Sequence, residues 1–558
     1  MALRATDAAG GWFYWDDFWW HDIVARNGLW ETAGMSLGGH YSPLTYIPYY
    51  LVTAAFPYEW APRVVIMLVT LLGINAGVLA VTRRLWPTRG PQLAVYVLWA
   101  FSSLAAPSWL WYSQFSMMGA LLLTSTWTLW AYLRALSTRG NRSSWLAVAL
   151  LALSLFTQER MLVTATLMGL FLVLVCSPTM VAARWRERRG LWAASLAVMS
   201  LWVLVYLSLP KAESLPTPVH TVVRLTIDMV RVSALPSLLG GPWVLDNEPV
   251  LSRAATPVVM QIVALGVLTT LVLFSLRLHS RAWAAWSILG LGLLIDAALV
   301  AVVRGSTMQD LAIGEWRYFS DLAVLAPLLM VSAFVAPGVA PNWSIGRLRA
   351  AWGAMSLFTA SAVMLGILLG GGWHKSLARP FVQTALSDLR DAQTPVVIME
   401  SVLPDTVVNE ALGAQRFASR VFSIVDPPAL FDEPTTDPKW LNREGELVPA
   451  ALAITRMSPS SGLCTVSLRG SETVWVPLPV PAEANEWGIR VRYRASQDVT
   501  VGVTDGVRTV TAAAPAGKES LFVPFYGLGH QVGLFLSSPS AAVCVQDVGA
   551  GRPGPDEG

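Results

Sequence analysis

The sequence predicts a multi-pass α-helical membrane protein with a C-terminal all-β domain, and three observations support this fold class. Hydrophobic residues make up 54% of the 558 residues and charged residues only 13%, whereas soluble domains carry about 25% charged residues. Many apolar stretches reach the length of about 20 residues that a helix needs to cross a bilayer. After residue 372 these stretches end, and short alternating strands follow.

The predicted membrane-spanning segments begin near residue 62. They are 62–82, 91–111, 115–133, 145–177, 190–209, 257–276, 283–303, 319–336 and 350–370. The run 145–177 is interrupted by Gln158, Glu159 and Arg160. Because it counts as two segments, we expect about ten passages in total.

Arginine clusters predict the orientation of these segments. The clusters are Arg83/Arg84/Arg89, Arg134/Arg139/Arg142, Arg184/Arg186/Arg188/Arg189, Arg277/Arg281 and Arg347/Arg349. They fall at every second connection, and cytoplasmic loops of membrane proteins collect Lys and Arg. We therefore expect residues 1–61 and everything after residue 371 to lie outside the cell membrane. The net charge is only +3, so nucleic acid is excluded as a partner.

Composition divides the chain into five predicted regions. These are an outer acidic and aromatic region at 1–61, the helical bundle at 62–372, an extracytoplasmic mixed α/β region at 373–462, a jelly-roll-like β-sandwich at 463–549 and a disordered tail at 550–558. Cys464 lies in the first predicted strand of the sandwich and Cys544 in the last. In an oxidising compartment these two could form a disulfide.

The densest polar group lies near the N-terminus. Asp16 and Asp17 stand among aromatic residues in the run 15–22, which is followed by His40 and Tyr41. Aromatic side chains lower the local dielectric and stack on sugar rings, so Asp16 or Asp17 is a candidate general base. Asp17 and His21 share a helical face at a metal-ligand spacing, which leaves a divalent metal open as a cofactor. The alternative is an outer-surface helix with solvated acids and interfacial tryptophans.

Two further groups of ionisable residues occur beside apolar runs. Only about 12 apolar residues precede Glu159 and Arg160, so both should lie inside the protein, below the outer surface. Arg304, Arg317 and Tyr318 lie at predicted outer helix ends, where arginine can bind phosphate. For Glu159 and Arg160, the alternative is an internal ion pair that locks two broken helices together. For Arg304 and Arg317, the alternative is ordinary snorkelling of the side chain to the membrane surface. For Asp296, we expect Arg304 or Arg317 as the partner.

The order of several short motifs resembles membrane glycosyltransferases of the GT-C fold, in particular the bacterial relatives of protein mannosyltransferases and aminoarabinose transferases. The motifs are WDD at 15–17, HYSPL at 40–44, the Pro62-Arg63 entry into a helix, LFTQERMLV at 155–163 and WRYFSDLAVLAPLL at 316–329. The resemblance covers about residues 1–370. It implies a sugar donor linked to polyprenyl phosphate, whose head group lies at the outer leaflet.

The resemblance also implies roles for single residues. Asp16 or Asp17 would deprotonate the acceptor, and Arg160 or Arg317 would hold the lipid phosphate. His40, Tyr41, Glu159 and Tyr318 would complete the substrate-binding site. The acceptor would be a glycan or protein of the cell envelope.

Two departures from the family keep other functions open. The family's first membrane helix has no counterpart ahead of the WDD motif, so we expect a late start-codon assignment, and the connection 112–116 lacks a second acidic residue. Both departures favour a catalytically inactive relative that binds or positions envelope glycan or lipid. A transporter would show internal repeats and polar residues near the bilayer midplane, and the sequence shows neither clearly.

Overall fold

The computed structural model describes most of the chain in two compact units. The described residues are 2–138, 141–176, 188–209, 217–246, 253–306, 308–341, 344–373, 378–392, 395–425, 429–458, 464–482, 487–525, 529–538 and 541–555. The first unit comprises Met1–Phe13 and Asn27–Ser376, and the second comprises Tyr14–Arg26 and Leu377–Gly558. The region predicted at 1–61 is therefore divided between the two units.

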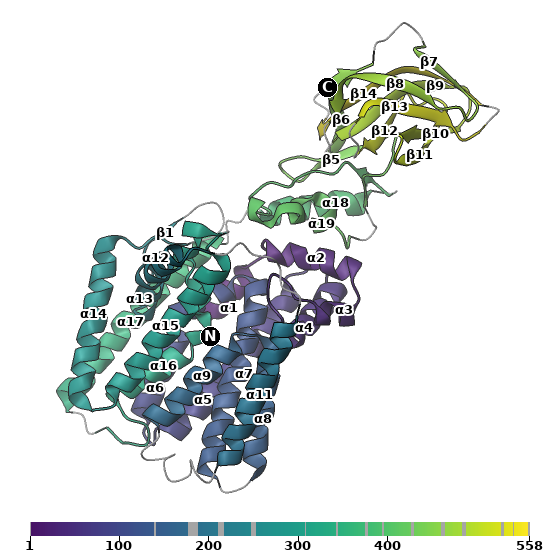
Figure 1. The fold of residues 1–558 in the computed structure, drawn as a ribbon. Helices are drawn as coiled ribbons and strands as arrows, with labels where there is room; N and C mark the ends of the chain where they lie inside the picture. The colour runs from purple at the N-terminus through teal and green to yellow at the C-terminus, as the bar shows by residue number, and fades with distance from the viewer. Residues whose placement is uncertain are drawn as a thin grey trace. The chain divides into compact units, whose positions relative to one another are not determined.

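The first unit is a bundle of helices (Figure 1). Its α-helices are α1 (Ala2–Gly10), α3 (Leu29–Gly34), α4 (Pro43–Ala55), α5 (Ala61–Leu85), α6 (Arg89–Ala100), α7 (Tyr112–Ser137), α8 (Asn141–Thr157), α9 (Met161–Leu170), α11 (Arg189–Ser208), α12 (Val219–Met229), α13 (Leu235–Leu238), α14 (Val258–Leu278), α15 (Ala282–Arg304), α16 (Leu325–Phe334) and α17 (Ile345–Trp373). Short 3-10 or π-helical segments are η1 (Ser103–Trp109), η2 (Phe171–Val175), η4 (Val230–Ala234), η5 (Gln309–Gly314) and η6 (Trp316–Leu322). A two-stranded ribbon, β1 (Leu245–Asp246) and β2 (Arg253–Ala254), completes the unit.

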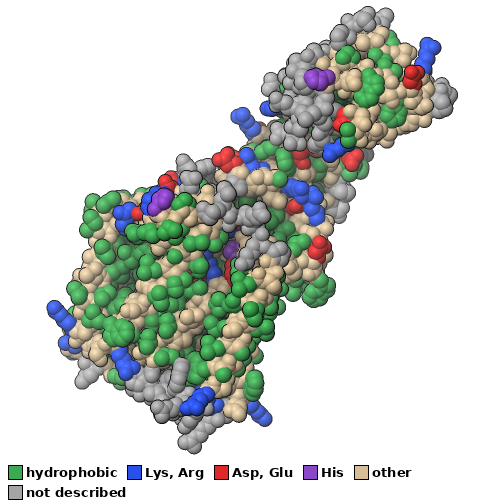
Figure 2. All heavy atoms as spheres, in the orientation of Figure 1, with side chains coloured by type: hydrophobic (Ala, Val, Ile, Leu, Met, Phe, Trp, Pro, Cys, Tyr) green, Lys and Arg blue, Asp and Glu red, His purple; other side chains and the backbone are tan. Residues whose placement is uncertain are grey.

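Five helices among the described residues are long and apolar enough to cross a membrane, and a sixth span arises if η6 and α16, bent by 64°, count as one. Their outward faces are apolar: Leu196, Val259 and Leu357 are 64%, 72% and 73% exposed. Such broad apolar faces are rare on soluble monomers and suit lipid. Figure 2 shows this apolar flank over the bundle. The chain is therefore a multi-pass membrane protein, while the count of ten passages stays a prediction.

Basic residues gather at one end of the bundle. Arg84, in the last turn of α5, donates a hydrogen bond to Ser137 at the end of α7 over 3.1 Å. Arg188, which precedes α11, donates to the carbonyl of Thr138. The C-terminal ends of α5 and α7 and the start of α11 therefore lie together. Arg139, Arg184 and Arg186 lie outside the described residues.

The second unit combines three small helical elements and α2 with a large β region. The helices are α2 (Asp16–Arg26), α18 (Ala378–Asp391), η7 (Glu410–Arg416) and α19 (Ala418–Val421). The strands are β3 (Val397–Ile398), β4 (Leu430–Phe431), β5 (Lys439–Leu441), β6 (Leu447–Met457), β7 (Val466–Arg469), β8 (Val474–Ala482), β9 (Trp487–Ala495), β10 (Val499–Thr504), β11 (Thr509–Ala514), β12 (Ser520–Phe525), β13 (Gly529–Leu536) and β14 (Ala542–Pro555).

Two sheets of the second unit share one hydrophobic core. The first sheet has the order β11-β10-β13-β8, and the second has β12-β9-β14-β6-β5-β3-β4 with β7 beside β14. Val501 and Val532 of the first sheet and Val491 and Leu521 of the second are all 1% exposed or less. Alternating inward residues therefore hold the sheets together. Cys464 and Cys544 form a disulfide with their Cα atoms 5.4 Å apart, as we expect from the sequence.

The prediction of a disordered tail from residue 550 is wrong for residues 550–555. They continue β14 and pair with β6, from Ala550 opposite Arg456 to Pro555 opposite Ala450. The Gly and Pro content suggested disorder, but pairing with a neighbouring strand satisfies the backbone groups of this segment. Residues 556–558 lie outside the described residues.

Asp432 makes the stability of the second unit depend on pH. Burial raises the pKa of Asp432 to about 6, and its Oδ1 atom accepts a hydrogen bond of 3.1 Å from the Glu400 backbone N–H. A carboxyl whose folded pKa is raised stabilises the fold below its unfolded pKa, and this contribution disappears as pH rises through the folded value.

We therefore expect the second unit to gain on the order of 1 kcal/mol between pH 7 and pH 4.5, after allowance for solvent screening of this partly exposed group. Hydrogen exchange of the full-length protein at the two pH values measures the gain. Asp432→Asn keeps an oxygen acceptor and should flatten the profile. An unchanged profile in this variant would assign the effect to other carboxyls.

Candidate functional site

A tight turn presents His40 at one end of the bundle. Gly38 and Gly39 have φ of 58° and 86°, a left-handed conformation that favours glycine. The backbone carbonyls of this turn accept three hydrogen bonds from side chains. Tyr46 Oη donates to the His40 carbonyl (2.8 Å), Tyr206 Oη to the Gly39 carbonyl (3.3 Å) and Arg304 Nη2 to the Gly38 carbonyl (3.5 Å). Side chains of α4, α11 and α15 thus set the position of His40.

The side chains of His40 and Glu159 connect the turn to the break between α8 and α9. The Nδ1 atom of His40 contacts Oε1 of Glu159. The Glu159 backbone N–H donates to Oε1 of Gln158 over 2.9 Å, which orders the break itself. No described residue hydrogen-bonds to Oε2 of Glu159. Residues separated by more than a hundred positions therefore meet here.

Arg160 connects this break to η6. Its Nη1 atom donates a 2.6 Å hydrogen bond to the Tyr318 carbonyl and lies 4.0 Å from Oδ1 of Asp321. The Arg160 guanidinium also lies 5.6 Å from the centre of the Tyr318 ring. Asp321 is fully buried, and it interacts with the buried Asp296 of α15.

The expectation that Arg304 or Arg317 partners Asp296 is wrong. The groups that interact with Asp296 are Asp321 and Arg160. Arg317 instead contacts Oε2 of Glu315 at 3.0 Å and lies over two rings, 4.4 Å from the centre of Trp111 and 5.3 Å from that of Tyr318. Helical spacing alone did not reveal which helix ends pack against each other.

Two residues of this cluster escaped the sequence analysis. Asp321 follows the predicted Arg317-Tyr318 pair by one helical turn, and that spacing was the available signal. Trp111 stands at the end of an apolar run, a position typical of interfacial tryptophans, yet it is 2% exposed. Tyr41, also predicted to bind substrate, follows His40 and is half-buried.

The cluster lies at the end of the bundle away from the arginine-rich connections. Helix α8 begins at Asn141, next to Arg188, and ends at Thr157, directly before Gln158. Its 17 residues rise about 25 Å, which is most of a bilayer core of about 30 Å. In Figure 2, basic, acidic and histidine side chains are visible together in a recess of the apolar surface.

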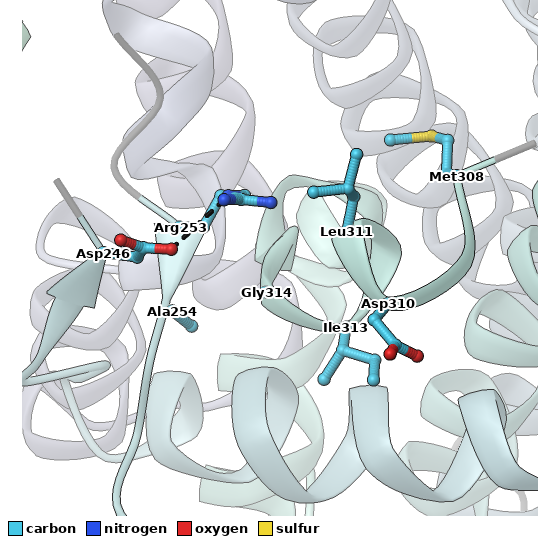
Figure 3. A pocket seen from close by; sticks show the side chains of 8 residues that line it. All are labelled: Asp246, Arg253, Ala254, Met308, Asp310, Leu311, Ile313 and Gly314. Carbon is cyan, nitrogen blue, oxygen red and sulfur yellow. Dashed lines mark hydrogen bonds and ion pairs between the residues drawn. The ribbon is translucent and has the colours of Figure 1, made fainter. Parts of the chain in front are cut away.

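A pocket of about 490 Å³ in the first unit adjoins this cluster. Its lining residues are Asp246, Arg253, Ala254, Met308, Asp310, Leu311, Ile313 and Gly314 (Figure 3). Arg253 donates to Asp246 over 3.1 Å, and Tyr318 Oη donates to Sδ of Met308 over 3.4 Å. The pocket falls in the size range of small-molecule sites, about 300–1,000 Å³.

The candidate acids Asp16 and Asp17 belong to the second unit. Oδ2 of Asp17 accepts a 3.0 Å hydrogen bond from the Tyr14 backbone N–H, and the Asp17 side chain is buried. Asp16 is partly exposed. His21, the possible metal partner of Asp17, is buried, and the described residues contain no group of three or more metal-ligating side chains.

Asp22 attaches the N-terminal helix α2 to the C-terminal part of the second unit. Nη1 of Arg420 in α19 lies 3.1 Å and 2.9 Å from the two oxygens of Asp22, and Arg26 lies 2.5 Å from Oδ1. Asp22 is only 6% exposed. This buried contact explains why residues 14–26 group with residues nearly 400 positions away rather than with their neighbours.

We expect Arg420→Ala to destabilise the docking of residues 14–26 by about 2 kcal/mol, because a buried carboxylate loses one of two cations. Faster hydrogen exchange in this segment of the full-length protein measures the effect. Arg416→Ala, which removes the exposed ion pair with Asp405, is the matched control. Equal exchange in both variants would contradict the expectation.

No protein-family model and no curated protein matches this sequence. Among solved structures, arabinosyltransferase EmbB from Mycobacterium smegmatis is similar at 11% identity and a TM-score of 0.31, over 100% of this chain and 65% of that chain. Arabinofuranosyltransferase AftD from Mycobacteria is similar at 11% identity and a TM-score of 0.32, over 92% of this chain and 55% of that chain.

This chain thus spans about two thirds of EmbB and about half of AftD.

Proposed function

We propose that this protein is a membrane glycosyltransferase that moves a sugar from a polyprenyl-phosphate donor to a cell-envelope acceptor on the outer face. One observation carries the proposal. His40, Glu159, Arg160, Arg317 and Tyr318 come from three distant segments and meet at the bundle end opposite the arginine-rich connections. The positive-inside rule assigns that end to the outer face.

Two arginines give this site the chemistry of phosphate recognition. The guanidinium groups of Arg160 and Arg317 lie 5.6 Å and 5.3 Å from the centre of the same Tyr318 ring. A guanidinium presents a planar fork of donors that matches phosphate oxygens. Transfer of the sugar leaves negative charge on the polyprenyl phosphate, and these cations stabilise it in the transition state.

The surroundings suit a lipid-linked donor. Apolar faces of the bundle provide a lipid-like environment for a polyprenyl chain. The pocket beside Met308 and Tyr318 offers space for a sugar or for part of the acceptor.

The resemblance assigns the base that deprotonates the acceptor to Asp16 or Asp17. Asp16 is the better candidate, because Asp17 is buried and accepts the Tyr14 N–H. The test is transfer from polyprenyl phosphates carrying radiolabelled pentoses or hexoses to envelope glycan. On this assignment Asp16→Asn lowers the rate about 100-fold, and exposed Asp391→Asn leaves it unchanged. Full activity of the Asp16→Asn, Asp17→Asn double variant would remove both from the mechanism.

One observation favours a second function, an inactive relative that binds or positions envelope glycan or lipid. Asp17 and Asp22 of the N-terminal motif engage the structure itself. Saturable binding of polyprenyl phosphate without transfer would favour that function. A transporter remains the third alternative, and solute flux in proteoliposomes would establish it.

A further inference from the structure

His40 has the surroundings of a catalytic base rather than those of a structural histidine. Its Nδ1 atom is engaged by Glu159, and no described residue bonds to its Nε2 atom. The His40 side chain is 27% exposed. A carboxylate on one ring nitrogen fixes the tautomer and orientation, so that the other nitrogen can accept a proton.

We propose that His40, oriented by Glu159, takes the proton of the acceptor hydroxyl during sugar transfer. This rests on the proposed function and places the base inside the first unit, in competition with Asp16 and Asp17. His40 is the catalytic residue in this scheme, and Glu159 is a positioning residue that also stabilises the imidazolium.

The step balances without another reactant. The acceptor oxygen forms a bond to the anomeric carbon while the bond from that carbon to the phosphate oxygen breaks. The proton of the acceptor hydroxyl moves to Nε2 of His40, and the electron pair of the broken bond leaves with the polyprenyl phosphate. Arg160 and Arg317, both beside the Tyr318 ring, supply the positive charge that neutralises it.

Several charged and titratable groups surround the turn that carries His40, and none of those on the neighbouring helices bonds to its Nε2 atom. The charged and titratable groups around the turn are Glu159 and Arg160 after α8, Tyr46 of α4, Tyr206 of α11 and Arg304 at the end of α15. The two tyrosines and Arg304 bond to backbone carbonyls of the turn. The Nε2 atom therefore stays available to the acceptor.

Rate profiles against pH test this assignment with the full-length protein in nanodiscs. His40→Gln should lower the transfer rate about 10²- to 10⁴-fold, the usual contribution of a general base, and should remove the acidic limb of the profile. Glu159→Gln should lower the rate at least about tenfold while keeping a displaced limb. The control is His220→Gln, which changes an exposed histidine of α12.

Labelling with diethyl pyrocarbonate gives a second measurement that needs no turnover. We expect His40 to react at Nε2 and decaprenyl phosphate to block the reaction, while His220 reacts with or without the lipid. Transfer at the wild-type rate by His40→Gln, with an unchanged pH profile, overturns the assignment. If no donor supports transfer by the wild-type protein, the proposed function fails. If His40 does not react with diethyl pyrocarbonate, or reacts equally with and without decaprenyl phosphate, the assignment of His40 as the base fails as well.

Discussion

Replacing Arg160 by alanine is expected to abolish sugar transfer and to destabilise the helical bundle. Arg160 is the cation that contacts Asp321, and Asp296 lies beside that aspartate. Removing one partner of a buried ion pair costs about 3–5 kcal/mol, because the remaining charge is left uncompensated. Loss of a donor that stabilises transition-state charge lowers a rate about 10²- to 10³-fold.

The two effects can be separated with a second substitution. Adding Asp321→Asn to Arg160→Ala removes the stranded charge, so thermal unfolding in detergent should return towards that of the unmodified protein. Sugar transfer should stay low, because the guanidinium is still absent. Arg231→Ala is the control, since its ion pair with Asp228 is on the surface and contributes about 0–1 kcal/mol. Recovery of transfer in the double variant would exclude Arg160 from phosphate binding.

Removal of the disulfide is expected to have the second largest effect. Cys464 and Cys544 are separated by 80 positions, and closing a loop of that length restricts the unfolded chain by about 4 kcal/mol. Cys464→Ser with Cys544→Ser should therefore lower the stability of the two-sheet region by roughly that amount. Urea unfolding followed by hydrogen exchange in β7 and β14 measures the change.

Cys176→Ser is the matched control for this pair, because Cys176 is a free cysteine buried in the first unit. Its replacement should leave exchange in β7 and β14 unchanged. If the double variant unfolds at the same urea concentration as the wild-type protein, the disulfide does not stabilise the two-sheet region by restricting the unfolded chain.

At the break formed by Gln158, Glu159 and Arg160, the sequence predicts burial but not the interaction partners. A short apolar run before charged residues indicated that these side chains lie inside the protein, and Glu159 is 15% exposed. Hydropathy does not encode which segment supplies the partners. The contacts with His40, Tyr318 and Asp321 arise from the packing of α4, η6 and α15 around the break.

For two tryptophans, the position along the sequence does not indicate whether the side chain is buried. Trp86 and Trp111 end apolar runs and fit an interfacial belt, yet they are 1% and 2% exposed. Trp86 donates to the Val335 carbonyl over 3.0 Å, and Trp111 lies against Arg317. A tryptophan at a helix end serves the interface or the interior depending on neighbouring helices, which local composition does not specify.

Apolar run length, arginine placement and strand alternation were readable in the amino-acid order, because each reflects a local preference for lipid, cytoplasm or a half-buried sheet face. They yielded the membrane class, the arginine-rich bundle end and the β-rich C-terminal region. Long-range packing alone established the Asp296-Asp321-Arg160 cluster and the attachment of residues 14–26 through Asp22 and Arg420. The reason is that buried charges take whichever partner the folded backbone brings near, and the distance along the chain does not limit that choice.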